Sequence, residues 1–372
     1  MKKIIQLKKN SWLLILLVFF TIAACETDSD EIDPNLIEEE NPNPEEEEEQ
    51  TREFSIDQNL INTNSSESTI ELYNYLRSQF GHNVISGQTY QQEQWDYIEA
   101  LTGKLPVMRE YDLQPYSSGY PYMWDNECGC HAFGINPNAT VVEDAIEWYE
   151  TNNGKPIIKF QWHWHSPSGG AAGTNTFYTE STDFDVSEAV ITGTEENDAI
   201  IRDIDSIATQ LKKFSVRGIP VLWRPLHEID GGWFWWSAHG PEPAKALWNI
   251  MYDRLVNYHG LNNLIWMWNG EDPGWYVGND KCDLVSLDSY PEEFDYDILE
   301  ESFDDLYDIT NGTKIIGISE NGAIPDMEEA FNNGITWSFF ITWVDHLSSA
   351  NSDQHIKDVY NNPNIITLED RD

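Results

Sequence analysis

The chain has 372 residues, of which 40% are hydrophobic and 13% aromatic, and its formal net charge is −44. This length accommodates one large domain with additional segments, because single hydrophobic cores stop growing at about 250–300 residues. The acidity excludes nucleic acid as an expected partner, since binding phosphates needs clustered Lys and Arg, and it gives no attraction to anionic lipid. The 16 Trp residues suit flat ligands such as sugar rings, and either a neutral or a cationic substrate is compatible with the charge.

The N-terminal residues predict export and a lipid anchor. A basic start precedes an apolar run over 12–22 that is too short to span a membrane comfortably. Small residues then lead to Cys25, and this order resembles a bacterial lipoprotein cleavage site. The resemblance implies a signal peptide over 1–24, lipidation of Cys25, and an outer-membrane lipoprotein that lies at the cell surface or faces the periplasm.

A strongly acidic segment follows over 25–53, with 14 acidic residues and one Arg. Such a composition cannot bury enough apolar surface to fold, so we expect a disordered spacer there. The folded domain is then expected over 54–372.

Three further Cys residues, Cys128, Cys130 and Cys282, allow at most one disulfide and leave one free thiol. A zinc site is disfavoured because only one residue separates Cys128 from Cys130 and no second pair follows. His163 and His165 share a strand face and would also suit a metal, but no third ligand with suitable spacing is apparent. No metal is therefore expected.

From about residue 70 the sequence alternates between short apolar runs and segments with helical spacing. Helical patterns lie at 91–101, 141–150, 198–214 and 243–258. Eight apolar runs predict strands. Two of these strands begin at 105–108 and 157–160, and the others lie at 83–86, 219–223, 264–268, 284–287, 315–319 and 337–343. Eight short strands with intervening helices predict an α/β fold, a (β/α)8 TIM barrel. A doubly wound sheet is the weaker alternative, because no Gly-rich phosphate loop follows the first strand.

Polar and aromatic residues gather where the predicted strands end, which is the functional end of such barrels. Glu228 follows the fourth strand and Glu320 ends the seventh. Hydrolysis of a glycosidic bond needs two carboxyl groups across that bond, one a general acid with a raised pKa and the other an ionised nucleophile or base. One such Glu alone would be interpreted as a surface carboxylate of an acidic protein. Two glutamates at strand ends, with Trp residues around them, favour a catalytic role.

Two segments resemble one enzyme family. Residues 223–236, WRPLHEIDGGWFWW, resemble the acid/base signature of glycoside hydrolase family 26, whose members are mostly endo-β-1,4-mannanases, and residues 318–322, ISENG, resemble its nucleophile segment. The resemblance runs from about residue 80 to the C-terminus. It implies a retaining endo-β-1,4-mannanase with Glu228 as acid/base and Glu320 as nucleophile.

The same resemblance implies roles for other residues. Trp233 would stack on the substrate, Tyr290 would hydrogen-bond the nucleophile, and Trp343 would lie under the sugar at the −1 subsite. His163 matches a subsite His, although His165 competes for that role. The implied substrate-binding residues are His163, Arg224, His227, Trp233, Asp288, Tyr290 and Trp343.

This reaction needs no cofactor, and the expected partners are a neutral polysaccharide such as mannan and the outer membrane, with the protein a monomer. Two alternatives within the family are a β-1,3-xylanase and a mixed-linkage β-glucanase. A rival from another class is a non-catalytic surface glycan-binding lipoprotein, which would keep the Trp platforms but need neither glutamate. Residues 116–133 match no pattern of the family and are expected in the second β→α loop.

Overall fold

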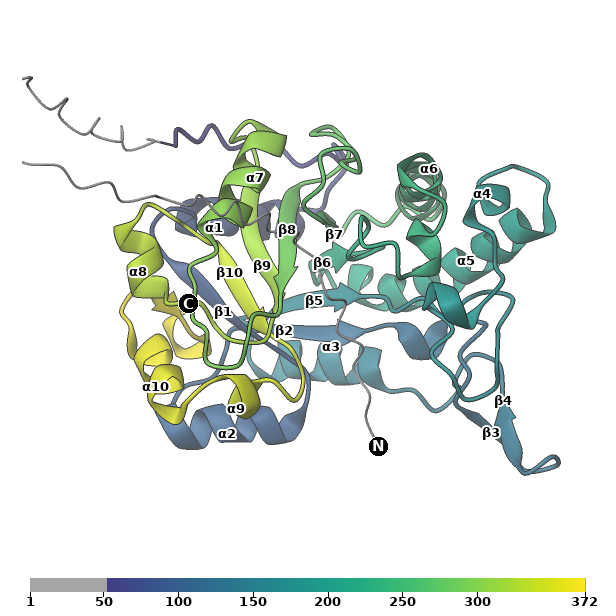
Figure 1. Ribbon diagram of the computed structural model, residues 1–372, viewed down its shortest axis with the longest axis horizontal. Coiled ribbons are helices and arrows are strands. Elements are labelled where there is room, and N and C mark those ends of the chain that lie inside the picture. The colour runs from purple at the N-terminus through teal and green to yellow at the C-terminus, as the bar shows by residue number, and fades with distance from the viewer. Residues whose placement is uncertain (1–51, 372) are drawn as a thin grey trace, which may run out of the picture. The chain divides into compact units, whose positions relative to one another are not determined.

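The computed structural model describes residues 52–371 (Figure 1). The expected signal peptide, Cys25 and the expected spacer up to residue 51 lie outside the described residues. No helix within 52–371 is long and apolar enough to cross a membrane.

The described chain contacts the body of the domain from its first residue. Arg52 forms ion pairs with Asp304 and Glu300, and the Phe54 ring packs edge-on against three other aromatic rings. The packed domain therefore includes Arg52 and Glu53, two residues that the composition places in the acidic spacer.

Eight parallel strands form a closed barrel, because β10 pairs with β1 as well as with β9. The strands are β1 (Val84–Thr89), β2 (Met108–Asp112), β5 (Ile157–Gln161), β6 (Val221–Arg224), β7 (Leu264–Asn269), β8 (Leu284–Ser289), β9 (Ile315–Asn321) and β10 (Phe339–Thr342). A short ninth strand, β11 (Ile365–Ile366), pairs with the first two residues of β1, Val84 and Ile85. The predicted barrel is confirmed, and closure excludes the doubly wound sheet.

Helices separate most of the strands and surround the barrel (Figure 1). They are α1 (Glu67–Gln79), α2 (Gln92–Thr102), α3 (Val141–Thr151), α4 (Val186–Ala189), α5 (Glu195–Ser215), α6 (Pro241–Tyr252), α7 (Glu300–Thr310), α8 (Met327–Asn332), α9 (Leu347–Ala350) and α10 (Asp353–Asn361). In α5, apolar residues three or four apart bury one face, and the Thr194 side chain accepts a hydrogen bond from the Asn197 amide at the N-terminus. Acidic residues in its first turn and Lys residues in its last turn suit the helix dipole.

Several strands extend further toward the C-terminal end of the barrel than the apolar runs predict. The run that begins at 105–108 continues as β2 (Met108–Asp112), which includes Glu110. The difference has a physical cause, since the inward-facing positions of the strands change from apolar to charged near this end, as from Met108 to Glu110 in β2. The predicted helix 243–258 also divides, into α6 and a π-helical turn over Asp253–Tyr258.

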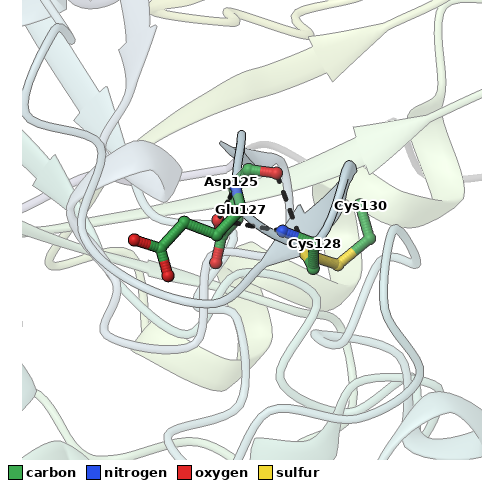
Figure 2. Close-up of a disulfide and its surroundings, with 4 residues drawn as sticks. All are labelled: Asp125, Glu127, Cys128 and Cys130. Carbon is green, nitrogen blue, oxygen red and sulfur yellow. Dashed lines mark hydrogen bonds between the residues drawn. A yellow bond between two sulfur atoms is a disulfide. The ribbon is translucent and has the colours of Figure 1, made fainter.

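A two-stranded hairpin in the loop between β2 and α3 was not expected. Its strands are β3 (Met123–Asp125) and β4 (Cys130–Ala132), and it projects from the body of the domain (Figure 1). A disulfide joins Cys128 to Cys130 at the turn (Figure 2). Both thiols are consumed in this bond, so the pair does not hold zinc, and Cys282 is the buried free thiol of the described chain.

Candidate active site

Three carboxyl groups meet at the C-terminal end of the barrel. Glu228, Asp288 and Glu320 each place one carboxylate oxygen within 4.8 Å of the other two. Glu320 is buried, whereas Glu228 is partly exposed. The two glutamates that the sequence singled out therefore lie at one mouth of the barrel, close enough to act on the same bond.

A β-bulge aims Glu320 into the barrel. The register between β8 and β9 shifts between Leu287, which pairs with Ile318, and Asp288, which pairs with Glu320. Ser319 is the extra residue, and its hydroxyl contacts Asp288 inside the barrel. Strict alternation would point consecutive side chains to opposite faces, but the bulge lets both Ser319 and Glu320 face inward.

Glu320 is held by a cation and a phenol. The Arg224 guanidinium donates to its Oε1 at 2.7 Å, and the Tyr290 hydroxyl donates to its Oε2 at 2.6 Å. The same Arg224 nitrogen also donates to Asp288 at 2.6 Å. Burial and the Asp288 carboxylate raise the pKa of Glu320, while Arg224 acts against them.

A second buried cation, Lys159, lies near Arg224 inside the barrel. The Lys159 ammonium contacts Glu110, and Arg224 lies 3.5 Å from the same Glu110 carboxylate. Burial and the nearby guanidinium of Arg224 lower the pKa of Lys159 to about 8. Two cations thus stand among the three carboxylates of Glu110, Asp288 and Glu320, all on the inner wall of the barrel. Sequence inspection missed Glu110 and Lys159, and charged residues inside otherwise apolar strands were the available signal.

Glu228 sits on a turn with unusual backbone geometry. Leu226 and Glu228 both have φ near 49°, in the left-handed region that most side chains avoid. The Glu228 amide donates to the side-chain oxygen of Asn269, whose amide nitrogen donates to Asp288 at 3.1 Å. Asn269 therefore connects the strained turn to the carboxylate cluster.

The environment of Glu228 favours its protonated form. Burial and the Asp288 carboxylate raise the pKa of Glu228 to about 7, and a hydrogen bond from Trp233 opposes this rise. The indole nitrogen of Trp233 donates to Oε2 of Glu228 at 2.7 Å, and 47% of the Trp233 residue surface is exposed. Trp233 thus contacts the Glu228 carboxyl directly while its ring stays about half exposed.

Two histidines, His163 and His227, lie beside the glutamates. His163 and His227 approach within 3.2 Å through their Nε2 atoms, and His163 Nδ1 contacts the Asp112 carboxylate at 2.5 Å. Burial lowers the pKa of His227, so it is neutral at ordinary pH. Between the two candidate histidines, His163 reaches the site, whereas His165 is buried against Thr176. Asp112, which sequence inspection missed, orients His163.

Trp343 borders a cavity beside the histidines. Its ring centroid lies 5.8 Å from that of His163, and its backbone amide bonds to the carbonyl of Asn321, next to Glu320. The cavity has a volume of about 280 Å³, and Tyr90, Asp112 and Trp343 are among its lining residues. Three aromatic rings, those of Tyr90, Tyr111 and Trp343, line this hollow beside the carboxylates of Glu110 and Asp112, and such walls suit a sugar ring.

Neighbouring polar and aromatic residues support the site rather than face it. The buried Asn321 side chain donates to the carbonyls of Gly322 and Ala323, so it shapes the loop after β9. Trp235 and Trp236 are buried, and both indole nitrogens donate to backbone carbonyls. The expectation that these two Trp residues pack rather than bind a ligand agrees with that burial.

Comparison with known proteins identifies relatives of this chain. Residues 61–370 match Glycosyl hydrolase family 26. The mannan endo-1,4-β-mannosidase of Thermothelomyces thermophilus is 38% identical over 330 residues, which are 86% of this chain and 64% of that protein. Mannan endo-1,4-β-mannosidase B of a Piromyces species is 32% identical over 84% of this chain and 53% of its own length. The chain thus spans between about half and two thirds of the length of these relatives.

Solved structures show the same architecture. The β-(1,4)-mannanase of Podospora anserina is 37% identical, with a TM-score of 0.75 over 85% of this chain and 69% of that one. A β-mannanase from a symbiotic protist of the termite Reticulitermes speratus, solved in complex with gluco-manno-oligosaccharide, is 29% identical, with a TM-score of 0.75 over 86% of this chain and 99% of that one. With a family match over most of its length and a barrel that superposes on these structures, the chain belongs to glycosyl hydrolase family 26.

Proposed function

We propose that this protein is a retaining endo-β-1,4-mannanase. The observation that carries the proposal is the short approach of Glu228 and Glu320, whose carboxylate oxygens lie within 4.8 Å. Retaining enzymes hold their two carboxyl groups about 5–5.5 Å apart, whereas inverting enzymes leave about 6.5–9.5 Å for a water molecule. The short approach supports direct attack on the sugar by one carboxylate.

The surroundings assign the two roles. Glu228 and Glu320 repel each other when both are ionised, so the pair favours a state with one proton. Arg224 and Tyr290 donate to Glu320, which places the negative charge there and the proton on Glu228. Glu228 would protonate the leaving oxygen while Glu320 attacks the anomeric carbon and forms the glycosyl-enzyme. Glu228 would then take a proton from the water that releases the sugar.

Mannan is the proposed substrate because the named relatives are mannan endo-1,4-β-mannosidases and one related structure holds a gluco-manno-oligosaccharide. A neutral polysaccharide also fits an acidic protein without charge repulsion. The test is release of reducing sugar from mannan, β-1,3-xylan and mixed-linkage β-glucan in parallel. We expect the highest rate on mannan. A higher rate on β-1,3-xylan or mixed-linkage β-glucan would make that polymer the substrate in place of mannan. Binding of a polysaccharide without release of reducing sugar would favour the non-catalytic glycan-binding lipoprotein.

Trp233→Phe should move the pH dependence of activity. Because the Trp233 hydrogen bond lowers the pKa of Glu228, removing it raises that pKa further above about 7. Activity that requires protonated Glu228 is lost as the pH rises through this pKa, so the basic limb of kcat/KM should shift upward by about one pH unit or less. Trp343→Phe is the control, since the described contacts of Trp343 do not include Glu228. A basic limb that stays in place in Trp233→Phe would contradict the acid role of Glu228.

We also propose that Cys25 carries the lipid anchor and that the protein is held at the outer membrane, on the strength of the N-terminal sequence alone. Cys25→Ala should move the protein from the membrane fraction to the soluble fraction with unchanged specific activity. Several acyl chains on one residue bind firmly, and the acidic segment offers no attraction to anionic lipid that could replace them. Continued membrane retention of the variant would show another anchor.

A further inference from the structure

The hairpin between β2 and α3 exposes aromatic rings that the site does not use. Trp124 on β3 pairs with His131 on β4, and their ring centroids are 5.7 Å apart. Tyr122 lies in the turn just before β3, and its ring centroid lies 6.1 Å from that of His131, so both rings contact the same histidine. Trp124 is 59% exposed and Tyr122 is 37% exposed. We call Tyr122, Trp124 and His131 the aromatic hairpin face.

The hairpin is braced rather than loose. The Cys128–Cys130 disulfide closes its turn, and the Asp125 carboxylate accepts hydrogen bonds from the Glu127 and Cys128 amides at 2.7 and 3.4 Å (Figure 2). A constrained turn holds the rings in place before a ligand arrives, which lowers the entropy cost of binding.

Ring contacts connect this face to the active site. The ring centroids of Tyr122 and His165 lie 6.1 Å apart, and the Tyr122 hydroxyl donates to the side-chain oxygen of Asn175. The ring centroid of Phe177 lies 4.9 Å from that of His165 and 4.8 Å from that of His163, which is beside the glutamates. His165 and Phe177 are buried, so packed rings brace the aromatic hairpin face against the wall of the active site.

We propose that the aromatic hairpin face is a distal subsite that binds the same β-linked neutral polysaccharide chain, remote from the scissile bond. The inference rests on the proposed function and adds to it a preference for long chains. Sugar rings stack on exposed aromatic faces, and their hydroxyl groups can donate to carboxylates such as those of Asp125 and Glu127 near the turn. These carboxylates disfavour an anionic ligand. Three rings are also far fewer than the roughly 20–30 residues of a standard protein interface.

The test compares a long and a short substrate of one linkage type. Trp124→Ala should lower kcat/KM on soluble mannan by about three- to tenfold, because one aromatic stacking contact is lost. It should leave kcat/KM unchanged on an aryl β-mannobioside, which is too short to reach the hairpin. Trp124→Phe should restore most of the activity on mannan. Tyr258→Ala, which removes a 66% exposed ring after α6, is the matched control and should change neither substrate.

An unchanged rate on mannan in Trp124→Ala, or an equal fall on both substrates, would overturn the proposal. Failure of the proposed function is a separate result. If the wild type cleaves xylan or mixed-linkage glucan instead, the same comparison is made with that polymer and its short aryl glycoside. If the wild type cleaves none of them, migration in gels that contain each polysaccharide replaces kinetics. If a polysaccharide retards the wild-type protein and retards Trp124→Ala less, the result would support the subsite. Equal migration of the two proteins in every gel would refute it.

Discussion

Glu320→Ala should lower kcat on mannan by at least about 10⁴-fold while the protein stays folded. Without the nucleophile no glycosyl-enzyme forms, and the Arg224 and Tyr290 contacts of Glu320 lose their acceptor. Kinetics together with thermal unfolding would check this. Glu242→Ala, which removes a carboxylate that is 87% exposed, is the matched control and should keep wild-type activity. Substantial turnover by Glu320→Ala would refute the nucleophile assignment.

Azide separates the roles of the two glutamates on an aryl β-mannoside with a good leaving group. In Glu320→Ala, azide can occupy the space of the lost carboxylate and attack the sugar directly, giving the α-mannosyl azide. In Glu228→Ala, the glycosyl-enzyme still forms on Glu320, and azide then replaces water and gives the β-mannosyl azide. The NMR spectrum of each product identifies the anomer. Exchanged anomers would reverse the two assignments.

Arg224→Met should cost both stability and activity. Arg224 is fully buried and pairs with Asp288 and Glu320. Removing one partner of a buried ion pair costs about 3–5 kcal/mol, because charged groups stay buried without compensation. Urea unfolding at pH 7 would measure this loss. Arg217→Met, which breaks an exposed pair with Glu150, is the matched control and should cost no more than about 1 kcal/mol.

The same variant predicts two pH effects of defined sign. Arg224 opposes the rise in the pKa of Glu320, so its loss raises that pKa further. A carboxyl group whose pKa is higher in the folded state than in the unfolded state destabilises the fold as the pH rises through the folded value. The stability deficit of Arg224→Met should therefore grow as the pH rises above the raised pKa of Glu320 in the folded wild type. The acid limb of kcat should move to higher pH, because the nucleophile must be ionised. A deficit that shrinks with pH would contradict this account.

The barrel follows from the sequence because its determinants are local. Apolar runs of about four to seven residues, separated by helical periodicity, report which segments are buried, and eight of them fit a closed parallel barrel. Glu228 and Glu320 stand out because they end such runs, and parallel strands bring their C-terminal ends together. The same signal does not single out Glu110 or Lys159, because Lys159 lies inside its run and Glu110 lies beyond the apolar start of its strand.

The direction of each side chain is decided by register and by partners distant in sequence. The alternation of β9 would turn Glu320 away from Ser319, and only its pairing with β8 creates the bulge that brings both inside. His163 and His165 look equivalent in sequence, yet Asp112 on the neighbouring strand selects His163 for the site. The sequence by itself thus determined the barrel and the two glutamates. The tertiary structure decided the bulge, the choice of histidine and the buried cations beneath the carboxylates, because these depend on contacts between strands that local composition does not record.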